Sequence, residues 1–216
     1  MIEGVAGARD FVAANTAIEA PPLVPEVRLH VATEMLPLWQ LTEAELAATG
    51  LPPPYWAFAW AGGQALARYV LDQPELVRGR TIADFGAGSG LVAIAAALAG
   101  AKSVTAIEID RNAREAIRLN ARLNGCYIAD ATDIDDIDPP PEVVLAADVF
   151  YEAPLAGLAT ELLTAAARRS ATVLVGDPGR TYLPKDRLRS LAEYRVETPR
   201  ALEDSDLCLT RVWQFN

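Results

Sequence analysis

The stretch Asp84-Phe-Gly-Ala-Gly-Ser-Gly90 places an acid and three alternate glycines between an apolar run and an alanine-rich run. Glycines at this spacing allow a sharp turn, close approach of the backbone to a ligand, and close packing at the start of a helix. A dinucleotide fingerprint needs glycine at its sixth position, where Leu91 stands, and a P-loop needs a lysine that this stretch does not contain. The loop therefore matches neither of these two phosphate-binding motifs.

Two acids indicate which nucleotide the loop could hold. A carboxylate at the end of a strand, such as Asp84, would repel a pyrophosphate, but it suits the ammonium group of S-adenosylmethionine. The carboxylate of that cofactor could accept hydrogen bonds from the loop amides. Glu108, 18 residues after Gly90, could accept from a ribose diol, and Asp110 follows on the same side of the strand. The pattern predicts an S-adenosylmethionine site; the alternative is a glycine-rich turn with surface acids.

The elements that must position these residues alternate between strand and helix patterns from residue 79 onward. Apolar runs predict strands at 81–85, 103–109, 142–147, 171–176 and 207–215, and helical spacing predicts helices at 91–98, 112–124, 156–169 and 185–194. Strands separated by helices of this length predict a Rossmann-like α/β fold, with a mostly parallel sheet and helices on both faces. Residues 130–138 are expected to form a solvated acidic loop.

Residues 1–78 depart from this pattern because they hold most of the prolines and three of the four tryptophans. Since prolines prevent long regular elements, we expect an N-terminal helix followed by a cap on the ligand end of the sheet. A chain of 216 residues commonly forms one domain. We therefore expect a single domain with the cap at 1–78 and the core at 79–216.

Composition and charge exclude several classes of function. The 19 basic and 29 acidic residues give a net charge of −10, which argues against a nucleic-acid surface; it is compatible with a basic protein partner, or it serves only solubility. Cys126 and Cys208 show neither zinc-site nor disulfide spacing, and a single histidine, His30, argues against a metal site or a Ser-His-Asp triad. The longest apolar run, 91–99, is too short to span a membrane, and the N-terminus resembles no targeting signal. These features are typical of a cytoplasmic protein.

Four further stretches of the chain form recognisable motifs: VPEVRLHVATEMLPLWQ, PPYWAFAWAGGQALARYVLDQPELVRGR, AADVFYE and LVGDPGR. With the glycine loop, they make the sequence resemble the seven-strand class I S-adenosylmethionine-dependent methyltransferases, and more narrowly the lysine methyltransferases of the electron transfer flavoprotein β subunit. The four motifs are more specific than the glycine loop, and the resemblance extends from Phe11 to Phe215. It implies methylation of a protein lysine, with the electron transfer flavoprotein β subunit as the favoured substrate.

The resemblance also implies roles for individual residues. The cofactor residues would be Asp84, Gly86, Gly88 and Gly90 at the methionine moiety, Glu108 at the ribose, Asp110 near the adenosine, Trp60 on the cap side, and Ala147. Asp130 would bind the adenine amine, but the stretch around it is short and acidic, so a place in the solvated loop is an equal alternative.

Asp148 and Tyr151 match the Asp-x-x-Tyr motif of the family and are the predicted catalytic residues. Asp148 would accept hydrogen bonds from the lysine amine and direct its lone pair toward the methyl group. Tyr151 and Trp60 would form an aromatic wall for a cationic nitrogen, although Tyr151 could also be a plain surface aromatic. Asp177 either shapes the substrate groove or is a turn aspartate.

Two other functions share this cofactor site. A small-molecule N-methyltransferase acting on a nicotinamide-like ring would need an enclosed pocket, whereas a protein lysine needs an open groove. A non-catalytic partner protein that binds S-adenosylmethionine could keep the glycine loop and lose Asp148 or Tyr151, and this chain keeps both.

Overall fold

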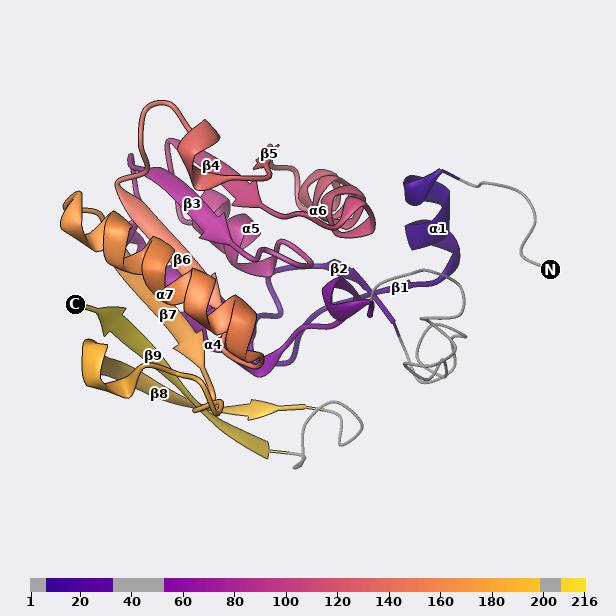
Figure 1. Cartoon of the computed structure of the whole chain (residues 1–216). Helices are drawn as coiled ribbons and strands as arrows, with labels where there is room; N and C mark the ends of the chain where they lie inside the picture. Colours follow the sequence, from indigo (N-terminus) through magenta and orange to yellow (C-terminus); the bar gives the residue numbers. More distant parts are fainter. Residues whose placement is uncertain (1–6, 33–52, 199–206) are drawn as a thin grey trace.

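Seven strands form one sheet in the order β5-β4-β3-β6-β7-β9-β8 (Figure 1). The computed structural model describes residues 7–32, 53–198 and 207–216, so part of the proline-rich cap, 33–52, lies outside the described residues. The strands are β3 (Thr81–Phe85), β4 (Ser103–Ile107), β5 (Ala129–Ala131), β6 (Val143–Ala147), β7 (Thr172–Asp177), β8 (Leu188–Glu197) and β9 (Leu207–Phe215). β9 runs antiparallel to β7 and β8, and the other neighbours are parallel. The predicted mostly parallel α/β sheet is confirmed.

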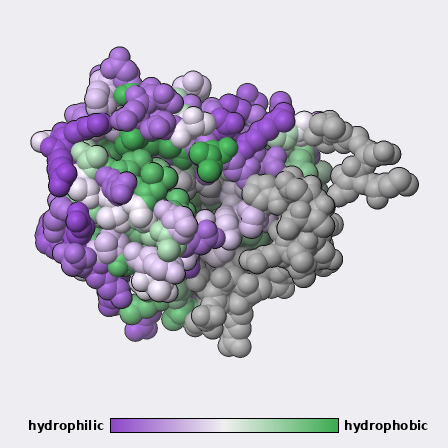
Figure 2. Space-filling view, in the orientation of Figure 1, coloured by the Kyte–Doolittle hydropathy of each residue, from purple (hydrophilic) through white to green (hydrophobic). Residues whose placement is uncertain are grey.

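Helices cover both faces of this sheet, as predicted. They are α4 (Ala61–Asp72), α5 (Leu91–Leu98), α6 (Arg111–Leu123) and α7 (Ala153–Arg168). β3 needs a helical layer on each face, because its side chains are buried on both. Ile82 packs in the apolar cluster that includes α4 and α5, and Phe85 packs in the cluster that includes α7. Figure 1 shows α7 in front of the sheet and α4 and α5 behind it. Figure 2 shows hydrophilic side chains around the rim of the α7 face and apolar ones toward its middle.

The predicted helix at 185–194 is wrong. A short 3-10 turn, η4 (Lys185–Arg187), leads into strand β8, which pairs with β9 from Leu188 opposite Phe215 to Glu197 opposite Leu207. The register shifts between Ser190 and Ala192, so the alternation of inward and outward side chains is broken within the strand. Pairing with β9, the next strand along the chain, overrides the helical preference of the local residues.

The described part of the cap packs mainly on α6. Helix α1 (Ala8–Ala14) confirms the predicted N-terminal helix, and an antiparallel pair, β1 (Ala17–Glu19) and β2 (Leu29–Val31), follows it. The cap also includes the 3-10 helix η1 (Tyr55–Ala57). α4 falls within 1–78 as well, but it packs on α5, β7 and β9 and so belongs to a helical layer of the core.

His30 is part of the contact between cap and core. Its backbone N–H donates to Asn120 Oδ1 at 2.8 Å, and its Nδ1 lies 3.0 Å from Thr16 Oγ1. Burial lowers the pKa of His30 below its usual range, which favours the neutral ring.

No helix in the described part of the chain has the length and apolar character to cross a bilayer.

Candidate active site

Four acids line the carboxyl edge of the sheet. Asp84 lies in β3, Asp177 ends β7, and Glu108 and Asp148 lie just beyond β4 and β6. β3 is flanked by β4 and β6 at the point where the strand order reverses, which is where open α/β sheets bind ligands. The predicted cofactor and catalytic residues therefore meet at one edge of the sheet.

The glycine loop joins β3 to α5 as predicted. Gly86 N donates to Ile107 O at 3.0 Å, which holds the loop against the end of β4. Gly90 precedes α5 with a φ of 79°, and a Cβ atom there would lie 3.2 Å from Ile117 Cγ1, so this glycine allows α5 and α6 to pack closely. A Cβ atom at Gly88 would come no closer than 3.7 Å to another residue. A Cβ atom at Gly88 would thus be in ordinary van der Waals contact with Trp56, whereas one at Gly90 would be crowded by Ile117.

Asp84 lies beneath this loop. Its side chain is 2% exposed, and Oδ2 accepts a hydrogen bond of 2.9 Å from Ala93 N in the first turn of α5. Burial raises the pKa of Asp84 to about 7, and the negative charge of Glu108 adds to the effect. The predicted neighbour of the cofactor thus also binds a helix amide.

Glu108 joins the loop to the start of α6. Its Oε2 accepts from Gly88 N at 3.0 Å, and its Oε1 accepts from Asp110 N at 2.9 Å. Burial raises the pKa of Glu108, and these amides oppose the shift. Asp110 caps α6, because its Oδ1 accepts from Asn112 N at 2.7 Å. Between the two acids, the side chain of Ile109 is 81% exposed, an apolar surface that the sequence prediction missed.

The residues at this end fit S-adenosylmethionine. In the described part of the chain, no lysine or arginine side chain pairs with Asp84 or Glu108, and both carboxylates accept hydrogen bonds from backbone amides. Two carboxylates without a cation suit a ligand that carries positive charge. The exposed Ile109 suits an apolar part of such a ligand.

The structure contradicts one of the two predictions for Asp130. It lies in the edge strand β5, so its assignment to a solvated loop is wrong, and Arg118 of α6 donates to its two oxygens at 2.9 and 2.8 Å. Arg118 also pairs with Glu115. Asp130 lines a cavity of about 450 Å³ together with Thr105, Arg114, Ala129, Ala131, Thr132, Asp136, Ile137 and Asp138. A contact with adenine stays a prediction, and it would share this carboxylate with Arg118.

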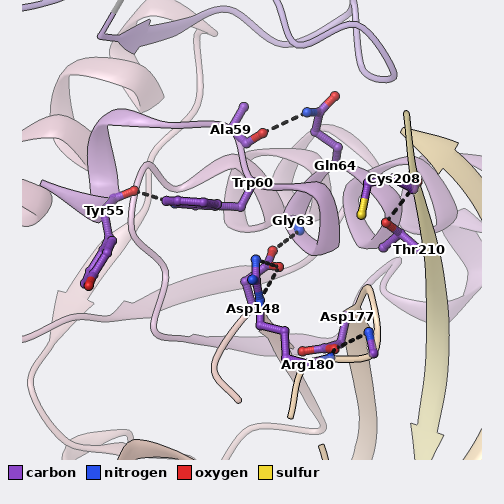
Figure 3. Close-up of polar contacts among 11 residues, drawn as sticks. Tyr55, Ala59, Trp60, Gly63, Gln64, Asp148, Asp177, Arg180, Cys208 and Thr210 are labelled. Atoms are coloured by element: carbon purple, nitrogen blue, oxygen red, sulfur yellow. Dashed lines mark hydrogen bonds and ion pairs between the residues drawn. The ribbon is translucent and has the colours of Figure 1, made fainter. Parts of the chain in front are cut away.

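Asp148 lies at the other end of the site (Figure 3). Its side chain is buried, with Oδ2 accepting from Gly63 N at 2.8 Å and Oδ1 accepting from Arg180 Nη2 at 2.9 Å. Burial raises the pKa of Asp148 to about 6; Arg180 opposes the shift and Asp177 adds to it. Asp148 also has a φ of 55°, a conformation that Asp and Asn tolerate better than most residues.

Close packing of α4 brings the Gly63 amide to this carboxylate. A Cβ atom at Gly62 would lie 2.3 Å from Gly176 O and 2.5 Å from Asp148 Oδ2. Only glycine therefore lets the first turn of α4 reach the ends of β6 and β7. Asp148 accepts from the N-terminal end of the helix, where a negative charge is favourable. The Gly62-Gly63 pair was the sequence signal for this contact, and the prediction did not use it.

Arg180 follows a turn organised by Asp177. Asp177 Oδ1 accepts from Gly179 N at 2.6 Å and from Arg180 N at 2.7 Å, which confirms Asp177 as a turn aspartate. The Arg180 guanidinium carbon lies 5.7 Å from the centre of the Trp60 ring. Arg180 ends the motif LVGDPGR, but no neighbouring residue in the sequence indicates that its side chain contacts Asp148.

Aromatic side chains surround this end of the site. Trp60 Nε1 donates to Tyr55 O at 2.8 Å, and the Tyr55 ring lies 5.2 Å from that of Tyr151. Burial raises the pKa of Tyr151 to about 12, with smaller contributions from Tyr55, Glu152 and Glu108, so the phenol is neutral at physiological pH. Ala147, the last residue of β6, pairs in register with Gly176. Tyr55 thus lies beside both rings, with its ring centre 6.2 Å from that of Trp60 and 5.2 Å from that of Tyr151.

Known proteins show both the family and the fold. Residues 64–169 match the model of the ribosomal protein L11 methyltransferase (PrmA) family. The electron transfer flavoprotein beta subunit lysine methyltransferase of Xenopus laevis is 38% identical over 215 residues, which cover 96% of this chain and 86% of that protein. The chain belongs to the electron transfer flavoprotein β-subunit lysine methyltransferase family. The predicted resemblance is confirmed, and the chain is an S-adenosylmethionine-dependent methyltransferase.

Two solved structures share the fold of this family member. Precorrin-6y C5,15-methyltransferase from Geobacter metallireducens GS-15 has a TM-score of 0.52 at 17% identity, over 71% of this chain and 88% of its own. Magnesium protoporphyrin IX methyltransferase from Synechocystis PCC 6803, solved with bound S-adenosylmethionine, has a TM-score of 0.51 at 15% identity, over 71% and 78%. At such identities the likeness supports the methyltransferase fold and says nothing of the substrate.

Proposed function

We propose that this chain is a protein-lysine N-methyltransferase that modifies the electron transfer flavoprotein β subunit. The observation that carries the proposal is the buried Asp148, which follows β6 at the same edge of the sheet as Asp84 and Glu108. The names of the relatives support the choice of substrate, because the match to the Xenopus laevis protein covers nearly the whole chain.

The cofactor end supplies the reactive group and holds it. When bound, S-adenosylmethionine supplies a methyl group on a positively charged sulfur, which a neutral amine can take by in-line displacement. Glu108 would accept from the ribose hydroxyls, and Ile109 would contact the adenine. The carboxylates of Asp84 and Glu108 would favour the positive charge of the cofactor over a neutral analogue.

Asp148 would position the acceptor. A carboxylate oxygen accepts a hydrogen bond from the lysine amine, which leaves the nitrogen lone pair directed at the methyl group. The same carboxylate stabilises the positive charge that develops on nitrogen during the displacement. The lysine ammonium can lose its proton to water before it enters, so the step needs no dedicated base.

The aromatic side chains would contact the acceptor and do not take its proton. Because the pKa of Tyr151 is raised to about 12, its phenolate is scarce at neutral pH. The faces of Trp60 and Tyr151 favour a cationic, partly methylated nitrogen. Tyr55 and Tyr151 are 39% and 36% exposed, so the described rim of the site is open to solvent, which favours a lysine on a protein surface over a small enclosed ring.

Incubation of the purified protein with methyl-labelled S-adenosylmethionine and the purified flavoprotein β subunit tests this proposal. We expect label on lysine residues of that subunit, located by mass spectrometry of its peptides. A lysate of the host serves as a parallel substrate mixture, and nicotinamide as the small-molecule comparison. Transfer to nicotinamide, with none to the subunit or to any protein of the lysate, would contradict the lysine assignment and leave the cofactor site standing.

A further inference from the structure

We propose that Arg180 is a resident cation of the acceptor site, which holds the Asp148 carboxylate in place and balances its charge throughout turnover. Arg180 would be a positioning residue, because it acts on the acceptor through Asp148. The inference rests on the role proposed above for Asp148 and adds a residue whose function neither the motif nor the fold assigns.

The contact between Arg180 and Asp148 is close and shielded from water. Nη2 of Arg180 donates to Asp148 Oδ1 at 2.9 Å, and Nε lies 3.3 Å from the same oxygen. The two side chains are 19% and 9% exposed. Such a pair has already lost most of its solvation, so removal of one partner leaves an uncompensated buried charge.

The backbone places Arg180 independently of this ion pair. Asp177 Oδ1 accepts a hydrogen bond from Arg180 N, which fixes the turn after β7 that carries the Arg180 side chain. The guanidinium carbon lies 5.7 Å from the Trp60 ring centre, and an aromatic face at this distance favours a planar cation. Figure 3 shows Arg180 reaching Asp148 from the side opposite Gly63, with Asp177 in the turn at the base of Arg180. Arg180 is thus held at three points around the acceptor site.

Charge balance decides whether the guanidinium stays or leaves when substrate binds. Among the groups that face Asp148, the Gly63 amide of α4 donates a hydrogen bond, Asp177 at the end of β7 adds a second negative charge, and Arg180 supplies the positive charge. The reactive lysine must be neutral and brings no charge to balance these acids. If it displaced Arg180, two buried carboxylates would face a neutral amine, which is costly. We infer that Arg180 remains bound to Asp148 in the reactive complex.

The variants Arg180→Met and Arg180→Lys test this inference. Methionine keeps much of the length of the side chain and removes its charge, whereas lysine restores the charge without the planar fork. The first measurement is an NMR titration of Asp148 with carbon-13-labelled aspartate, which requires no substrate. We expect Arg180→Met to raise the pKa of Asp148 by at least about one unit above its value of about 6, and Arg180→Lys to restore most of the shift.

The second measurement is the pH profile of kcat/KM on the flavoprotein β subunit. Because Asp148 must be ionised to accept from the amine, the acidic limb should move to higher pH in Arg180→Met by the same amount as the NMR titration. Arg187→Met serves as the matched control, since the Arg187 guanidinium donates to Thr164 Oγ1 instead, and it should leave both curves unchanged. Cofactor affinity should remain within about twofold in all three variants.

Two results would overturn the inference. One is a pKa of Asp148 and an acidic limb that stay in place in Arg180→Met. The other is a lower KM and faster turnover in Arg180→Met, which would show that Arg180 occupies the place of the lysine and must be displaced. If the wild-type protein transfers no methyl group to the subunit, the proposed function fails, and the NMR titration still decides the role of Arg180.

Discussion

The two ends of the active site hold their acids in different ways. At the cofactor end, Asp84 and Glu108 accept hydrogen bonds from backbone amides, and no described lysine or arginine pairs with them. At the acceptor end, Asp148 accepts from an amide and from the Arg180 guanidinium. All three carboxyl groups have raised pKa values because of burial, but only that of Asp148 is also lowered by a resident cation.

This difference follows from the charges of the two ligands. S-adenosylmethionine brings its own positive charge, so the acids that hold it need no protein cation and would bind more weakly if they had one. The acceptor amine is neutral when it reacts, so the acid that orients it needs a permanent counter-charge. At the cofactor end the ligand would bring the positive charge, whereas at the acceptor end Arg180 of the chain supplies it.

A charged side chain in the glycine loop should cause the largest loss of affinity for S-adenosylmethionine. In Gly88→Asp, a side chain and a third carboxylate enter the loop beside Trp56, and we expect the affinity for S-adenosylmethionine to fall by about 100-fold or more. Calorimetry measures the affinity. Gly125→Asp is a matched control, because Gly125 also has a positive φ, of 67°, with no atom near its missing Cβ. Unchanged affinity in a folded Gly88→Asp protein would remove the basis for the cofactor assignment.

Loss of the ribose acceptor should weaken the same end to a lesser degree. Glu108→Ala removes charge-assisted hydrogen bonds, and we expect a loss of about 1–3 kcal/mol in cofactor binding. The pKa of Asp148 should stay near 6, because the two ends would be independent. A variant that binds the cofactor normally and loses turnover would show that Glu108 belongs to the acceptor end instead.

A further prediction concerns the stability of the cofactor end in place of its ligand affinity. The pKa of Asp84 is about 7 in the folded protein against an ordinary value of 3.8, so folding favours its protonated form. Its contribution to the free energy of unfolding is fully present below about pH 4 and is lost as the pH rises through about 7. Asp84→Asn should therefore melt at a higher temperature than the wild type at pH 8 in the absence of cofactor, with little difference at pH 4. Parallel melting curves across this range would contradict a raised pKa for Asp84.

Most of the core fold could be predicted from local patterns. β3, α5 and β9 have the predicted bounds because each is a clear apolar or β-branched run with a turn signal at its ends. β8 could not be predicted, since its bulge breaks the period of two that marks a strand. The three-residue edge strand β5 carries too little pattern to be distinguished from a loop.

The site was predictable as a set of residues, and much less as a set of contacts. The glycine loop, Glu108 and Asp148 follow from motif and order along the chain. The partners of Asp148 and Asp130 do not, because Arg180 and Arg118 reach them from other elements of the tertiary structure. Asp84 was expected to face a ligand ammonium, and local sequence could not show that one of its oxygens binds Ala93 N.

Asp148→Asn tests most directly whether the two ends have separate tasks. Asparagine suits a φ of 55° and can still accept from Gly63 N, but its amide offers one acceptor and directs an NH₂ group toward positive charge. Calorimetry with S-adenosylmethionine and turnover on the flavoprotein β subunit are measured on the same preparation. We predict a cofactor affinity within about threefold of the wild type and turnover lower by about 100- to 1,000-fold. Turnover within a few-fold of the wild type, or a parallel loss of affinity and turnover, would contradict the account.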